Sequence, residues 1–172
     1  MLDNDIVEAA QRLLKICERK KLILATVESC TAGLVAGTLA DVPGVSSMLD
    51  RGFITYSNQS KQEMVGVSAD TLKQHGAVSR ETAEEMARGA IAKAPVDLAV
   101  SVTGIAGPDG GSAEKPVGLV HFAVASRSGR LQHVEKRFGD LGRSEVRKQS
   151  VLQAFKMLHD LAELEDAKPE RN

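Results

Sequence analysis

Short apolar runs that alternate with helical patterns constrain the fold of this chain more than any other feature. Residues 22–27 (LILATV) and 97–102 (DLAVSV) are short, apolar and bounded by polar residues, which predicts buried strands. Residues 51–56 (RGFITY) predict another strand. Residues 117–125 and 131–138 flank the turn SRSGR and predict a hairpin. Together these segments predict a mixed sheet.

Helical patterns separate the strands. Apolar spacing predicts helices over residues 4–19 and 144–164, and a run of small residues predicts one over residues 30–41. Capping residues predict three further helices, which begin after Ser57 or Asn58, after Ser68 and after Ser79. Strands and helices that alternate in this way favour an α/β fold with layered α/β/α architecture.

The chain of 172 residues fits a single domain, which we expect over residues 1–165, with residues 166–172 as a frayed tail. Neither cysteine belongs to a metal-ligand pair, and no metal or cofactor is expected. The acidic start MLDNDIVEA is unlike a signal peptide, and no apolar run reaches the length of a membrane span. We therefore expect a cytoplasmic protein without membrane contact.

The net charge and the aromatic content indicate which partners the chain is suited to bind. The formal net charge is −1 and aromatic residues make up 3% of the chain, so neither a basic footprint for nucleic acid nor a stacking platform for single strands is expected. The helix over residues 30–41 has small faces that would let subunits pack closely. A homodimer is therefore compatible with the sequence.

The stretch VESCTAGL gathers reactive side chains at a strand-to-helix corner: Glu28, Ser29, Cys30 and Thr31. A hydroxyl beside a helix start can attack a carbonyl group, while backbone N–H groups stabilise the oxyanion. Cys30 is a rival nucleophile, because a helix N-terminus lowers the pKa of a thiol. The simpler alternative is that Ser29 or Thr31 is only a helix cap.

The segment TYSNQSK, residues 55–61, offers a base. If Lys61 is desolvated in a cleft, its pKa falls and its amine can accept a proton from a serine. Tyr56 could then relay a proton or orient the amine. The alternative is that Lys61 is a solvated helix residue and Tyr56 an amphipathic strand end.

The loop TGIAGPDGGS, residues 103–112, follows a buried strand, where ligand sites of α/β sheets gather. Its glycines let the backbone approach a ligand, and their N–H groups can form an anion nest; a turn without a ligand is the alternative. Arg143 and Arg147 lie four residues apart on one helical face. They could clamp a phosphate, or they could be surface arginines.

Four segments occur in a fixed order along the chain: ESCTAG, RGFITYSNQSK, HGAVS and VTGIAGPDGGSAEKPVGLV. This combination resembles the CinA C-terminal domain family over residues 5–160. The resemblance implies an amidohydrolase with nicotinamide mononucleotide as its small-molecule substrate. Hydrolysis of the carboxamide would give nicotinate mononucleotide and ammonia, as a step in pyridine nucleotide recycling.

The resemblance also assigns roles to residues. It places the nucleophile on Ser29 and the base on Lys61, and it has Tyr56 and Thr103 orient the lysine or pass the proton to ammonia. It implies that N–H groups near Cys30 and Thr31 hold the oxyanion, and that the backbone of residues 104–111 holds the phosphoribosyl part. Substrate contacts are expected from Glu28, Cys30, Thr31, Asn58, Gly104, Ile105, Ala106, Gly107, Gly110, Gly111, Arg143 and Arg147.

Two positions depart from the family pattern. Ala32 replaces the first glycine of SCTGG, which should cost little in a helix, and Asp109 interrupts a run that relatives read as GPGGG. A carboxylate at residue 109 would disfavour a phosphate unless it points away. Two rival functions remain open: a protein-binding module linked to competence or the DNA-damage response, and a phosphate-ligand sensor that performs no chemistry.

Overall fold

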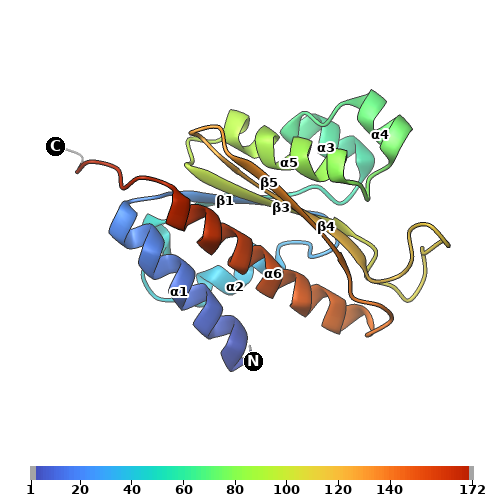
Figure 1. Cartoon of the computed structure of the whole chain (residues 1–172), viewed down its shortest axis with the longest axis horizontal. Helices are drawn as coiled ribbons and strands as arrows, with labels where there is room; N and C mark the ends of the chain where they lie inside the picture. Colours follow the sequence, from blue (N-terminus) through green and yellow to red (C-terminus); the bar gives the residue numbers. More distant parts are fainter. Residues whose placement is uncertain (1–2, 171–172) are drawn as a thin grey trace.

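The computed structural model, which describes residues 3–170, has a mixed sheet between two layers of helices (Figure 1). The strands are β1 (Leu24–Glu28), β2 (Leu49–Ile54), β3 (Leu98–Gly104), β4 (Leu119–Ser126) and β5 (Leu131–Arg137). Their order is β2-β1-β3-β4-β5. Strand β1 is parallel to β2 and β3, whereas β4 is antiparallel to β3 and β5. The predicted α/β/α fold with a mixed sheet is confirmed.

Helices cover both faces of the sheet (Figure 1). On one face lie α1 (Asn4–Lys20), α2 (Leu34–Ala40) and α6 (Arg143–Leu164), and on the other lie α3 (Asn58–Val65), α4 (Ala69–His75) and α5 (Arg80–Lys93). A short 3-10 helix, η1 (Val45–Ser47), leads into β2. None of the helices within residues 3–170 combines the length and the apolar character that a bilayer span needs.

The burial of both faces of β4 explains why this strand is mostly apolar. Val120, Phe122 and Val124 belong to the core under α1 and α6. On the opposite face, Ala123 and Ala125 pack against alanines of α5. Because both faces are covered, the strand needs no polar alternation. The same burial applies to β1, which is buried at every residue.

The helix expected over residues 30–41 is the one element that begins far from its predicted position. It starts at Leu34, whereas the bounds of the other elements lie within two residues of expectation. Ala32 has a φ of 48° and Gly33 a φ of 95°. These left-handed residues cannot continue a right-handed helix, so residues 29–33 form turns instead. Ser29 and Thr31 are therefore not N-caps of α2, and the expected helix start at Cys30 is wrong.

The segment that follows α6 has no regular structure, but part of it is held in place. The N–H of Lys168 donates to the carbonyl oxygen of Lys20 at 2.9 Å, and the Lys168 ammonium group pairs with Asp97 at 2.6 Å. Residues 166–170 therefore differ from the expected frayed tail. Residues 171–172 lie outside the described residues.

The contact between α3 and α5 gives a test of the packing. A Cβ added at Gly89 in α5 would collide with the carbonyl oxygen of Val65, at the end of α3. We expect Gly89→Ala to lower the free energy of unfolding by about 3 kcal/mol, because the helices must move apart. Gly37→Ala in α2 is the control, since a Cβ there has no neighbour within 4 Å.

The control should raise the free energy of unfolding by about 0.5–1 kcal/mol, because alanine favours a helix. Urea denaturation measures both variants. A Gly89→Ala protein as stable as the wild type would contradict the close approach of α3 to α5.

Candidate active site

The carboxyl ends of the parallel strands β1, β2 and β3 lie side by side at one edge of the sheet. Glu28 at the end of β1 lies in register with Val102 of β3 and with Ile54 of β2. A cavity of about 270 Å³ opens just beyond this edge. It is lined by Ser29, Cys30, Tyr56, Lys61, Ala77, Val78, Thr103, Gly104, Ile105, Ala106, Gly107, Asp109, Gly110 and Arg143. Four residues that the resemblance assigned to catalysis thus share one cavity: Ser29, Tyr56, Lys61 and Thr103.

Ser29 and Lys61 are in direct contact. The Lys61 Nζ lies 3.1 Å from the Ser29 Oγ, and it donates a second hydrogen bond to the carbonyl oxygen of Thr55 at 2.7 Å. Ser29 is 8% exposed and Lys61 only 1%. The solvated-helix interpretation of Lys61 is therefore wrong.

Local structure brings Lys61 to this position. The N–H of Thr55 donates to the carbonyl oxygen of Glu28 at 2.8 Å, so the chain beyond β2 stays alongside β1. Ser57 then caps α3: its Oγ accepts from the N–H of Ser60, while the Ser60 Oγ accepts from the N–H of Ser57. This reciprocal cap fixes the start of α3, and Lys61 follows in its first turn.

Burial changes the protonation of Lys61. It lowers the pKa of the amine from 10.5 to about 8, with a small opposing effect from Cys30. Both hydrogen-bond partners of the amine, a hydroxyl and a backbone carbonyl, are neutral. A lysine without a counter-ion in a dry site favours its uncharged form. Near neutral pH, part of the population therefore carries a free amine beside Ser29.

Cys30 also lines the cavity, but its thiol is held protonated. Burial raises the pKa of Cys30 to about 11, although the Arg147 charge acts on it in the opposite direction. The thiolate, not the thiol, is the strong nucleophile. The site therefore favours the Ser29 hydroxyl, which has a base within reach, over the Cys30 thiol.

Glu28 does not reach the cavity. Its carboxylate accepts hydrogen bonds from the N–H groups of Val35 and Ala36 at 2.8 and 3.1 Å, and from the Thr26 hydroxyl at 2.9 Å. Gly33, at the N-cap of α2, has no side chain for this task. Glu28 was expected to contact the substrate. Its carboxylate instead binds the backbone at the start of α2, where a negative charge is favourable.

Tyr56 and Thr103 line the cavity but have partners other than Lys61. The Tyr56 Oη lies 3.0 Å from Nη2 of Arg143, and the Thr103 hydroxyl donates to the carbonyl oxygen of Ala77 at 2.8 Å. The group that orients the lysine amine is the Thr55 carbonyl. The expectation that Tyr56 or Thr103 holds Lys61 is therefore not met in this structure.

The glycine-rich loop forms the opposite wall. Gly104 has no room for a side chain, since a Cβ would lie 2.7 Å from a methyl group of Val120. Gly107 and Gly110 have φ values of 84° and 91°, which glycine adopts without strain. Asp109 lines the cavity with them, whereas Gly111 does not. Arg143 ties this wall to α6, because its Nη1 donates to the Gly107 carbonyl oxygen at 2.9 Å.

The side chains of three further predicted substrate contacts do not line the cavity. Asn58 is the exposed first residue of α3. Thr31 is fully buried, and its carbonyl oxygen accepts from Arg147. Arg147 binds this backbone instead of lining the cavity. The side chains of Asn58, Thr31 and Arg147 thus do not reach the cavity in this structure.

Sequence reasoning also missed three residues. The Thr55 carbonyl has no side-chain signature that could reveal its role. Ala77 and Val78 line the cavity and lie within HGAVS, one of the four characteristic segments, which was the available signal. Within residues 3–170, no group of His, Cys, Asp and Glu side chains is arranged to hold a metal ion.

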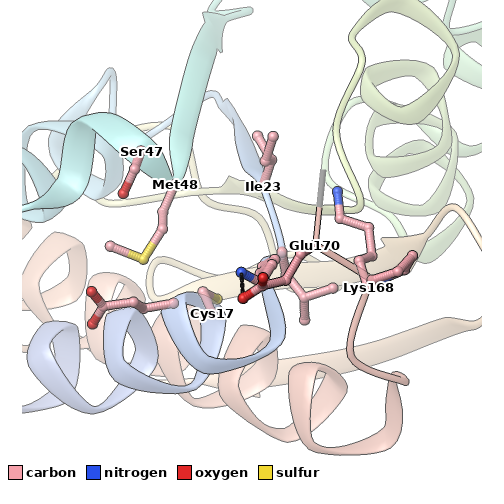
Figure 2. Close-up of a pocket in the computed structure, with 10 residues that line it drawn as sticks. Cys17, Ile23, Ser47, Met48, Lys168 and Glu170 are labelled. Carbon is pink, nitrogen blue, oxygen red and sulfur yellow. Dashed lines mark hydrogen bonds and ion pairs between the residues drawn. The ribbon is translucent and has the colours of Figure 1, made fainter. Parts of the chain in front are cut away.

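A larger cavity, of about 760 Å³, lies away from this edge (Figure 2). It is bounded by the end of α1, by Met48 and by the segment after α6. Its two lysines are paired with carboxylates: Lys21 with Glu170 at 3.3 Å and Lys168 with Asp97 at 2.6 Å. Because Ser29 and Lys61 meet in the smaller cavity, that cavity is the candidate active site.

Comparisons with known proteins show what this chain is similar to. The model of the CinA C-terminal domain family matches residues 6–162. The nicotinamide-nucleotide amidohydrolase PncC of Escherichia coli (strain K12) is 44% identical over 159 residues, which cover 92% of this chain and 95% of that protein. PncC of Enterobacter agglomerans is 53% identical over 126 residues, or 73% of this chain and 76% of that protein.

A solved structure is also similar to this chain in fold and in sequence. The crystal structure of competence/damage inducible protein CihA from Agrobacterium tumefaciens superposes with a TM-score of 0.92 and is 50% identical in sequence. The match covers 94% of this chain and 98% of that one.

The burial of Lys61 predicts an effect on stability. Because its pKa is lowered on folding, the folded protein binds fewer protons than the unfolded chain between pH 8 and 10.5. Lys61 therefore opposes folding below about pH 8, and this penalty disappears as the pH rises through 10.5. Lys61→Met lacks this penalty, so its free energy of unfolding relative to the wild type should be about 3 kcal/mol higher at pH 7 than above pH 10.5. The loss of the partner of the Thr55 carbonyl affects the variant equally at every pH.

The gain should shrink steadily between pH 8 and 10.5 in denaturation experiments. Lys73→Met, at an exposed lysine of α4, is the control and should change little. If the stability difference between Lys61→Met and the wild type did not change between pH 7 and 10.5, the amine would not be desolvated as the structure indicates.

Proposed function

The chain belongs to the CinA C-terminal domain family, and we propose that it hydrolyses the carboxamide of nicotinamide mononucleotide, with Ser29 as nucleophile and Lys61 as base. The chain is a hydrolase, like the relatives named as amidohydrolases. The observation that carries the finer proposal is the buried contact of 3.1 Å between the Ser29 Oγ and the Lys61 Nζ. A nucleophile within hydrogen-bond reach of a base is what acyl transfer requires.

The first step forms a covalent bond to Ser29. The Thr55 carbonyl oxygen accepts one N–H of the neutral Lys61 amine, which leaves the nitrogen lone pair free for Ser29. Lys61 takes the hydroxyl proton as the Ser29 Oγ bonds to the amide carbon. The π electrons of the amide carbonyl move onto its oxygen, which gives a tetrahedral oxyanion.

The oxyanion then collapses to an ester. Lys61, now an ammonium group, gives its proton to the amide nitrogen as the C–N bond breaks, and ammonia leaves. The nicotinoyl group remains attached to the Ser29 Oγ. This use of one residue as base and then acid follows the logic of the serine–lysine variants of the catalytic triad.

Water completes the reaction. Lys61 takes a proton from a water molecule as the water oxygen attacks the ester carbon. The bond between that carbon and the Ser29 Oγ then breaks, and the Oγ regains its proton from Lys61. The balance is one amide and one water consumed, with one carboxylic acid and one ammonia formed.

The rest of the substrate would lie along the glycine-rich wall. Of the residues that line the cavity, Arg143 and Lys61 carry amine or guanidinium groups and Asp109 carries a carboxylate. Arg143 is exposed and is held by Gly107 and Tyr56. We assign the phosphate to Arg143 and the loop backbone, because charge-assisted hydrogen bonds favour a doubly charged group there.

The nucleophile can be tested by substitution. We expect Ser29→Ala to lower kcat for ammonia release by at least about 1000-fold, because the covalent step is lost. Cys30→Ala should keep most of the rate, since the thiol is held protonated. Ammonia release from nicotinamide mononucleotide measures both variants.

The reverse pattern would move the nucleophile to Cys30. A wild-type protein that binds the mononucleotide without releasing ammonia would instead favour a sensor of phosphate ligands.

The phosphate contact can be tested by pairing substrates with a variant. We expect nicotinamide riboside to have a kcat/KM about 10- to 100-fold below that of the mononucleotide, because one or two charge-assisted hydrogen bonds are lost. Arg143→Ala should remove most of this preference. A variant that kept the full preference for the mononucleotide would show that Arg143 does not bind the phosphate.

A further inference from the structure

Arg147 of α6 binds the backbone of the nucleophile corner. Its Nε donates to the carbonyl oxygen of Cys30 and its Nη2 to that of Thr31, both at 3.1 Å. These are the two residues that directly follow Ser29. Arg143, one helical turn earlier, lines the cavity. The structure therefore separates two arginines that the sequence presented as equivalent.

These contacts fix the directions of the peptide groups. In a trans peptide, the carbonyl of one residue and the N–H of the next point in opposite directions. Because Arg147 holds the Cys30 carbonyl toward α6, the N–H of Thr31 points away from α6. The Ser29 carbonyl accepts from the N–H of Ala32 at 3.0 Å, which fixes the N–H of Cys30 in the same way.

The corner depends on Arg147 because the Cys30 carbonyl has no other hydrogen-bond partner within residues 3–170, whereas the Thr31 carbonyl also accepts from the N–H of Leu34 at 3.0 Å. Cys30 is 5% exposed and Thr31 is fully buried. A buried carbonyl that loses its hydrogen bond is strongly unfavourable. Without the guanidinium, the peptide group that joins Cys30 and Thr31 would therefore reorient to find another partner, and the N–H of Thr31 would lose its fixed direction.

We propose that Arg147 is a positioning residue that sets the N–H of Thr31 as a donor to the oxyanion, beside the N–H of Cys30, and that its charge helps to stabilise that oxyanion. The inference rests on the proposed function, since it takes Ser29 as the nucleophile. Arg147 acts through the backbone and does not touch the substrate.

The charge of Arg147 is felt at the corner. Although burial raises the pKa of the Cys30 thiol, the Arg147 guanidinium acts on that pKa in the lowering direction. A group that favours negative charge on the sulfur of residue 30 also favours it on an oxygen bound beside Ser29.

Steady-state kinetics test the proposal with a matched control. We expect Arg147→Ala to lower kcat about 100-fold with KM within about threefold, as for the loss of an oxyanion donor. Arg147→Lys should fall between this variant and the wild type, since an ammonium group can hold one carbonyl. Ethylguanidinium added to Arg147→Ala should restore part of kcat.

Arg127 is the control because it also donates to backbone carbonyls, those of Ile91, Ala94 and Val96, and lies outside the cavity. Arg127→Ala should lose stability without a change in kcat per folded molecule. A second readout is the rate at which an alkyl fluorophosphonate labels Ser29, followed by mass spectrometry. Labelling also builds negative charge on an oxygen, so Arg147→Ala should slow it in parallel with kcat.

Several results would overturn the inference. If Arg147→Ala matched the wild type or Arg127→Ala in kcat per folded molecule, the positioning role would be wrong while the proposed function stood. A raised KM with unchanged kcat would mean that Arg147 contacts the substrate directly. If the wild type neither released ammonia nor was labelled at Ser29, the proposed function itself would fail, and the inference with it.

Discussion

A lysine amine taken out of water without a counter-ion is the constraint on which the site depends. Lys61 is almost completely buried, and its two partners are a hydroxyl and a carbonyl that carry no charge. Such a site lowers the pKa of the amine, so that folding itself produces a lysine that is partly uncharged near neutral pH. The stability lost by burying Lys61 is the cost of this arrangement, and the cap at Ser57 and the pairing of Thr55 with Glu28 hold the chain in place against it.

The corner that faces Lys61 is held by charged groups that lie behind it. Glu28 accepts from N–H groups at the start of α2, where an anion is favourable, and Arg147 donates to the carbonyls that follow Ser29. The Glu28 carboxylate thus binds backbone N–H groups, and the Arg147 guanidinium binds backbone carbonyl groups. The left-handed residues Ala32 and Gly33 delay the helix until Leu34 and make room for this turn. On the cavity side, the corner presents the Ser29 hydroxyl to the Lys61 amine.

Helices and strands, which depend on residues close together in the sequence, could be predicted. Contacts between residues far apart in the sequence could not. The strands and the hairpin follow from apolar runs and turn residues, and capping serines located α3, α4 and α5. The late start of α2 was missed because alanine at residue 32 gives no sign that it adopts a positive φ. Arg143 and Arg147 share one helical face, so only the packing of α6 against the corner shows which one reaches the cavity. The resemblance located Ser29 and Lys61, but the Thr55 carbonyl has no sequence signature.

The most direct test of the account is a titration of the Lys61 amine. Lysine side chains labelled with ¹³C can be followed by NMR across pH 6 to 11, and the Lys61→Met variant assigns the signal. The account predicts a pKa of about 8 for Lys61, and a rise of kcat/KM with pH that has the same midpoint. A Lys61 signal that titrates at its ordinary value of about 10.4, while activity is already complete near pH 8, would contradict the claim that the neutral amine is the base.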